Sequence, residues 1–283
     1  MSGPDMFPSP RRTREGFDVA ADVSIVENVQ RPLKGEDAEV IDTEHCIAVI
    51  DGVTSHGEQI EGKSLGAFAA SVGREALLEA AQIDCPAEER PRRIVEHLSA
   101  RLRERLGNRS FQESPTFVFA AFFPEHALVV RVGDCSVLVD AQPLDAMPNQ
   151  PLRVEEVKKK MRERLAQSGR HTSIEISAMT RAWQHERRNN DEGKAGFYAY
   201  GAIDGMSVPR SLIEHCVLPP GDHEVALSTD GVWRPALRSA FEGPEMTAEQ
   251  MEHMKEDPEV PLSEKAPDDL TYVHFRVHVP SRG

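Results

Sequence analysis

Three short β-rich runs follow one another with almost no chain between them, and this feature limits the possible fold more than any other. The runs TFVFAAFF, ALVVRV and SVLVD occupy 116–123, 127–132 and 136–140, and only PEH and GDC separate them. A parallel crossover needs about a dozen residues or more, so separators this short allow only antiparallel hairpins. The sequence therefore predicts a mainly antiparallel sheet.

Further strands are predicted on both sides of this block. The run FDVAADVSIVENV at 17–29 alternates loosely, and the runs at 38–42 and 46–51 are joined by the polar DTEH, which indicates a hairpin. Near the C-terminal end, EVALS at 224–228 and LTYVHFRVHV at 270–279 are also typical of strands.

Two amphipathic helices are predicted between the strands, over 64–81 and 90–106. Apolar residues recur every three or four positions in the first, and every four positions in the second. The stretch 142–194 is more polar and is a candidate for an inserted flap. It contains a helical pattern, VEEVKKKMRERLAQSG, and an expected exposed loop, QHERRNNDEGK at 184–194.

This order of elements predicts the fold class. Strands, a helix pair, more strands and a closing strand indicate an α+β protein in which stacked antiparallel sheets carry helices outside, rather than an alternating βαβ series. The simplest organisation is one domain over 17–283, preceded by a flexible leader at 1–16 that contains three prolines and the RRTR tetrapeptide.

Acidic residues stand where the predicted strands end. Any single Asp-Gly pair is most simply a turn former, because aspartate bonds its own backbone and glycine accepts positive φ. If the strands bring their ends together, the carboxylates would repel one another unless cations neutralise them. Oxygen ligands without a His or Cys cluster suit Mg²⁺ or Mn²⁺. The acidic positions are Glu36, Asp37, Asp51, Asp134, Asp230, Asp268 and Asp269.

In chain order, GEDAEVID, AVIDGVTSHG, RVGDCSVLV, LSTDGVW and APDDLTYV resemble the successive motifs of the metal-dependent protein phosphatase family, the type 2C serine/threonine phosphatases, in their bacterial form. The resemblance extends from about 17 to 279. It implies a β-sandwich of two antiparallel sheets flanked by helices, with a centre of two Mn²⁺ or Mg²⁺ ions in a cleft at one edge.

The resemblance also implies roles for the metal ligands. Asp51 would bridge both ions, and the carbonyl of Gly52 would bind one of them. Asp230 and Asp268 would hold the other ion. Asp134 matches a carboxylate associated with a third, weaker metal.

Four further residues are carried over from the same resemblance. Glu36 and Asp37 match the acidic pair that acts near the metals, mostly through bound water. Arg31 is a candidate for the phosphate-binding arginine, although it stands one position further from Glu36 than expected, and Lys34 is the alternative. His56 would protonate the leaving alkoxide or fix a water, and the alternative is a turn histidine that only bonds backbone.

The resemblance implies hydrolysis of phosphoserine and phosphothreonine in proteins. In the arrangement that the resemblance implies, two divalent ions would activate a water as hydroxide for direct attack on phosphorus, and no side-chain nucleophile would be needed. The alternative is a noncatalytic, phosphatase-shaped binding module. Two departures from the family pattern matter here: GVTSHG replaces a turn of smaller residues, and Asp269 replaces an asparagine, where its charge either tightens metal binding or is merely solvated.

Composition limits the partners. A formal charge of -14 argues against a nucleic-acid surface, which needs clustered Lys and Arg. No run approaches the roughly 18 apolar residues of a spanning helix, so no membrane partner is expected. The four cysteines include no CxxC pair, which indicates reduced thiols, and we expect a cytoplasmic protein. The oligomeric state stays open.

Overall fold

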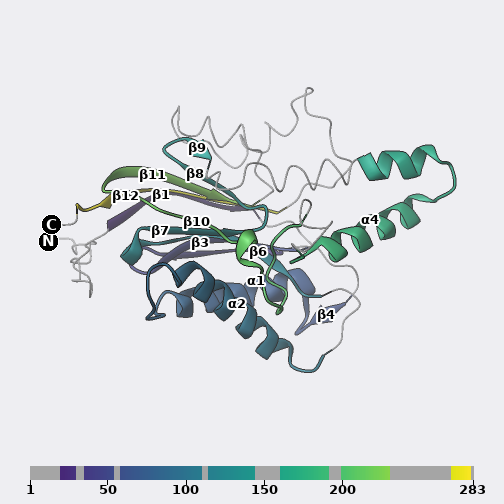
Figure 1. The fold of residues 1–283 in the computed structure, drawn as a ribbon, viewed down its shortest axis with the longest axis horizontal. Helices are drawn as coiled ribbons and strands as arrows, with labels where there is room; N and C mark the ends of the chain where they lie inside the picture. Colours follow the sequence, from purple (N-terminus) through teal and green to yellow (C-terminus); the bar gives the residue numbers. More distant parts are fainter. Residues whose placement is uncertain are drawn as a thin grey trace, which may run out of the picture.

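The computed structural model describes residues 20–29, 35–53, 58–109, 114–143, 160–190, 199–229 and 269–281. Two five-stranded antiparallel sheets are stacked face to face (Figure 1). Their strands are β1 (Ala20–Val29), β2 (Asp37–Asp42), β3 (Cys46–Gly52), β6 (Phe117–Phe123), β7 (Leu128–Val132), β8 (Ser136–Val139), β9 (Gln142–Pro143), β10 (Glu214–Val217), β11 (Gly221–Ser228) and β12 (Leu270–Val279). One sheet has the order β1-β12-β11-β8-β9, and the other has the order β10-β7-β6-β3-β2.

Successive side chains of the central strands point alternately into two apolar layers. In β3, Val49 belongs to the core between the sheets, whereas Ile50 belongs to the core beneath the helices. Between the sheets, Phe122 of β6 packs on Phe275 of β12 with ring centroids 5.2 Å apart. Because both faces of the central strands are buried, the strands read as continuous apolar runs rather than as alternating ones.

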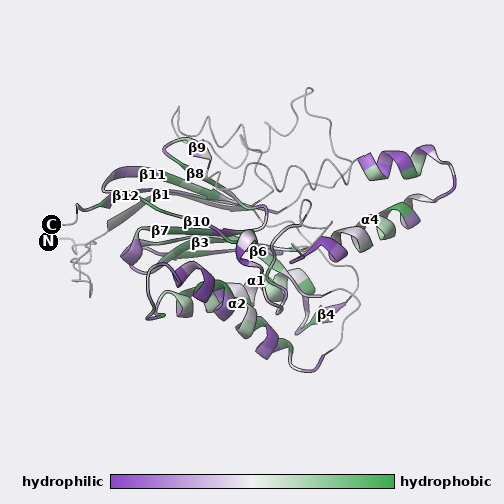
Figure 2. Cartoon of the chain, in the orientation of Figure 1, coloured by the Kyte–Doolittle hydropathy of each residue, from purple (hydrophilic) through white to green (hydrophobic). Residues whose placement is uncertain are grey.

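Two helices, α1 (Leu65–Ala80) and α2 (Arg90–Leu106), cover the outer face of the β10-β7-β6-β3-β2 sheet (Figure 1). The hydroxyl of Ser64 caps α1 by accepting a hydrogen bond from the Ala67 N–H at 3.1 Å. Helix α2 mixes hydrophobic and hydrophilic residues, while β3 and β7 are mainly hydrophobic (Figure 2). This pattern is expected of a helix that lies between a sheet and solvent.

Two smaller features complete the described structure. The two-residue strands β4 (Gln59–Ile60) and β5 (Lys63–Ser64) form a ribbon just before α1. Helix α4 (Ser173–Arg187) and a further α-helical segment at 160–167 project to one side of the sandwich (Figure 1). None of the described helices combines the length and apolar character needed to cross a bilayer.

The α+β sandwich predicted from the sequence is confirmed, and so are the hairpin at DTEH and the helix over 90–106. The exposed loop expected at 184–194 is wrong in its first part, because 184–187 form the end of α4. Strand β10 was not predicted. The leader at 1–16 and the acidic stretch before β12 lie outside the described residues.

Candidate metal centre

Asp37 and Asp51 face each other where β2 begins and β3 ends. They are register partners in the antiparallel pair, and the Gly52 N–H donates to the Glu36 carbonyl at 3.1 Å. This bond places the two aspartates in a pair without mutual backbone bonds, where Cα atoms approach to about 4.5 Å and side chains are closest. Like charges directly opposite each other are unfavourable, so a cation would stabilise the pair of Asp37 and Asp51. The start of β2 and the end of β3 around this pair are called the acidic corner below.

Gly52 allows the backbone to pack tightly beside these carboxylates. A Cβ atom at this position would lie 2.4 Å from the Gly66 carbonyl oxygen and 2.6 Å from the Glu36 carbonyl oxygen. Only glycine fits between these two backbone segments. The first turn of α1 therefore lies directly against the end of β3.

Glu36 provides the clearest sign of a site that accepts a positive charge. Its side chain is 3% exposed, and one carboxylate oxygen, Oε1, accepts a hydrogen bond from the Ser64 hydroxyl at 2.7 Å. The other oxygen, Oε2, is buried and has no hydrogen-bond partner among the described residues. A buried carboxylate oxygen is costly unless a cation or a cation-bound water satisfies it, so the residues present fit a divalent metal.

Two segments from the C-terminal half are attached to the same corner. The Thr229 hydroxyl donates to Asp37 Oδ2 at 2.7 Å, and Asp269 Oδ2 accepts from the Glu36 N–H at 2.7 Å. Thr229 directly precedes Asp230, and Asp269 directly follows Asp268. The chain neighbours of both predicted ligands are thus bonded to the start of β2, while Asp230 and Asp268 themselves lie outside the described residues.

Asp134 lies in the turn between β7 and β8, after Gly133 with a φ of +93°. A Cβ atom at Gly133 would lie 2.2 Å from a methyl carbon of Val118, and Val118 is the register partner of Asp51. Asp134 therefore belongs to the same end of the sheets. Within the described ranges, however, no three His, Cys, Asp or Glu side chains are close enough together to hold a metal ion.

An arginine that the sequence analysis did not single out lies beside this end of the sandwich. Arg188, just after α4, donates to the Thr116 hydroxyl at 2.8 Å and to the Tyr200 hydroxyl at 3.4 Å. The Thr116 carbonyl accepts from the Val53 N–H at 3.0 Å, directly after the Asp51-Gly52 pair. Burial raises the pKa of Tyr200, and the Arg188 charge opposes this shift. In the sequence, Arg188 falls within QHERRNNDEGK, the stretch that was expected to be an exposed loop.

The two catalytic candidates, Arg31 and His56, lie outside the described residues, and so does the alternative Lys34. Their roles stay predictions from the sequence.

The architecture is that of the type 2C serine/threonine phosphatases. The Mycobacterium tuberculosis serine/threonine phosphatase PstP/Ppp aligns over 94% of this chain and 99% of its own, with 16% identity and a TM-score of 0.50. The PstP catalytic domain in complex with two manganese ions aligns over 93% and 100%, with 15% identity and a TM-score of 0.54. An S. agalactiae serine/threonine phosphatase aligns over 91% and 98%, with 12% identity and a TM-score of 0.50.

At these identities the likeness establishes the fold alone. No protein-family model matches this sequence, and no curated protein matches it either.

Proposed function

We propose that this chain is a manganese- or magnesium-dependent protein serine/threonine phosphatase. The observation that carries the proposal is the acidic corner at the start of β2, where Asp37 and Asp51 face each other and the buried Glu36 has one oxygen without a protein partner. The likeness to solved phosphatases supports the same function, including one structure that contains manganese.

The metal ligands in this proposal come from both halves of the chain. Asp51, the Gly52 carbonyl, Asp230 and Asp268 would hold two ions, with Glu36 and Asp37 beside them and Asp134 at a third, weaker site. The contacts of Thr229 and Asp269 support this set, because they attach the chain on either side of the 230–268 segment to β2. When bound, such ions acidify water and neutralise phosphoryl oxygens, which permits direct hydrolysis of a phosphate monoester.

The protein itself holds the carboxylates of the proposed centre in position. Ser64 holds one oxygen of Glu36, and Thr229 holds one oxygen of Asp37, so both carboxylates are fixed before any substrate arrives. A side chain at position 52 would collide with α1. Because Gly52 has none, the backbone that carries its carbonyl can lie close against this helix. Arg31 or Lys34 would bind the substrate phosphate, and His56 would supply a proton to the leaving alkoxide.

The test is hydrolysis of phosphoserine and phosphothreonine peptides by the full chain, titrated with MnCl₂ and MgCl₂. Asp51→Asn should abolish turnover, since removing a ligand that stabilises charge in the transition state costs orders of magnitude in rate. Asp42→Asn is the matched control, because Asp42 lies at the opposite end of the same hairpin, paired with Cys46.

Full activity of Asp51→Asn would overturn the assignment of the centre. A folded wild-type chain without turnover at any metal concentration would favour the noncatalytic alternative, a phosphatase-shaped binding module.

A further inference from the structure

A cavity of about 480 Å³ lies at the end of the sandwich opposite the candidate metal centre. Pro220 and Val279 line it, and they stand beside the first residue of β11 and at the last residue of β12. The metal centre lies at the other ends of these two strands. Since β11 has eight residues, the two sites are separated by about 25 Å.

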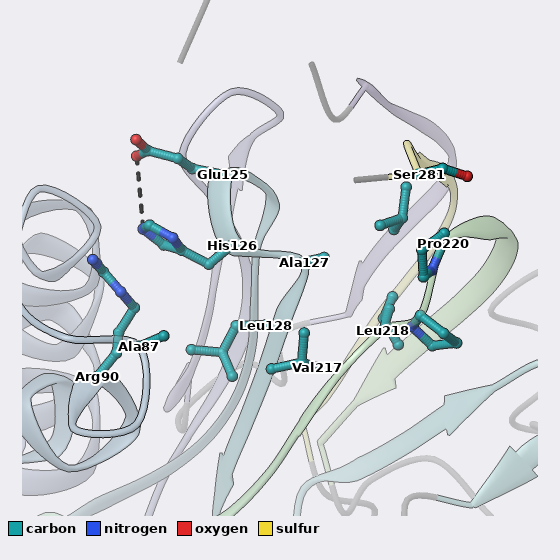
Figure 3. Close-up of a pocket in the computed structure, with 12 residues that line it drawn as sticks. Ala87, Arg90, Glu125, His126, Ala127, Leu128, Val217, Leu218, Pro220 and Ser281 are labelled. Carbon is teal, nitrogen blue, oxygen red and sulfur yellow. Dashed lines mark ion pairs between the residues drawn. The ribbon is translucent and has the colours of Figure 1, made fainter. Parts of the chain in front are cut away.

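Most of the cavity wall is apolar. Leu128, Val217, Leu218 and Pro220 form the floor and one side in Figure 3, and Val217 is 58% exposed at the edge of its sheet. Such a volume, with mainly apolar walls and a few polar groups, is typical of small-molecule sites.

The polar side of the cavity contains a buried cation. Arg90 of α2 is 6% exposed and lines the cavity. Two of its guanidinium nitrogens donate to backbone carbonyls, Nη1 to Ile83 at 2.7 Å and Nη2 to Cys85 at 3.3 Å. The third nitrogen, Nε, is buried without a hydrogen-bond partner, and no carboxylate among the described residues forms an ion pair with this guanidinium.

A negatively charged ligand would stabilise the buried guanidinium of Arg90. A guanidinium remains protonated at any ordinary pH, and a buried charge is costly when no opposite charge compensates it. Glu125 also lines the cavity, and its carboxylate lies 3.8 Å from the ring nitrogen Nε2 of His126 (Figure 3). Glu125 would repel a doubly charged group such as phosphate more than a singly charged one.

We propose that the cavity binds a small amphiphilic carboxylate, such as a medium-chain fatty acid. The carboxylate lies on the Arg90 side, and the apolar chain packs against Leu128, Leu218 and Pro220. The proposal does not depend on the phosphatase activity, because the cavity is remote from the metal centre and its ligand is a monoanion rather than a phosphate ester.

Calorimetric titration of the full chain with decanoate, below its micelle concentration, tests this site. Arg90→Met keeps the length of the side chain but removes the charge, and it should weaken decanoate binding about tenfold or more, which is the value of one charged hydrogen bond. Arg92→Met is the matched control on the same helix, because Arg92 is paired with Glu96 at 2.7 Å. It should leave the affinity unchanged.

Two further measurements keep the proposal falsifiable if Arg90→Met fails to fold. Val217→Trp, at an exposed position, should fill the mouth and abolish binding. Decan-1-ol, which has the same chain but no charge, should bind the wild type about tenfold more weakly than decanoate. No binding of decanoate, equal binding of the acid and the alcohol, or unchanged binding to either cavity variant would each overturn the proposal.

Discussion

Replacing Thr229 by valine tests the attachment of the C-terminal half to the acidic corner. Thr229 is fully buried, and its hydroxyl donates to Asp37 Oδ2 at 2.7 Å. The hydroxyl oxygen of Thr229 also accepts a hydrogen bond from the Thr271 N–H at 3.0 Å. Loss of a hydrogen bond to a charged acceptor costs about 1.5–3 kcal/mol, and a buried N–H left without an acceptor costs about 1–3 kcal/mol. Burial of the additional methyl group returns about 1 kcal/mol, so we expect a net loss of about 3 kcal/mol.

The assay is urea denaturation, followed by fluorescence and circular dichroism. Thr229→Ser is the control, because it keeps the hydroxyl and loses only a methyl group, at a cost of about 1 kcal/mol. If valine costs less than about 1 kcal/mol, or if serine costs as much as valine, the two hydrogen bonds do not hold the corner together.

Three further predictions concern packing and protonation. Gly52→Ala should destabilise the chain by about 1–3 kcal/mol or more in a thermal melt, because the new Cβ would lie 2.4 Å from the Gly66 carbonyl oxygen. Burial raises the pKa of Cys46, so in peptide maps of the native protein iodoacetamide should modify the half-buried Cys85 and leave Cys46 unmodified until unfolding. Burial lowers the pKa of His274 below its ordinary value of 6.5. His274 therefore binds a proton more readily in the unfolded chain than in the folded chain, so the free energy of unfolding should fall as the pH drops below about 6.5. In His274→Gln, the midpoint of urea unfolding should fall less over the same pH range.

Elements with a strong local pattern were predictable from the sequence. Helix α2 has the predicted bounds, because Ile94, Leu98 and Leu102 mark its buried face, while Pro91 and Gly107 mark its ends. Strand β10, EHCV, was not predictable in this way. Its residue Glu214 is buried because Arg131 of the neighbouring strand forms an ion pair with it, and that partner is 83 positions away in the chain.

The same distinction applies to the candidate site. The opposition of Asp37 and Asp51 follows from counting outward from the DTEH hairpin, in which Asp42 pairs with Cys46. The bond between Glu36 and Asp269 spans 233 positions, and no local pattern contains it. Only the ordered resemblance to a known family placed these segments together.

Asp269 shows what the structure adds to that resemblance. The sequence left two interpretations of its charge, tighter metal binding or simple solvation, and solvation is wrong because the residue is 3% exposed. The hydrogen bond from the Glu36 N–H does not require a charge, since the side-chain oxygen of an asparagine would accept it equally well. Aspartate thus places a second carboxylate oxygen in this buried position beside the Glu36 N–H, where an asparagine would place a neutral amide group. In the proposed centre, bound divalent ions would offset the charge of that carboxylate.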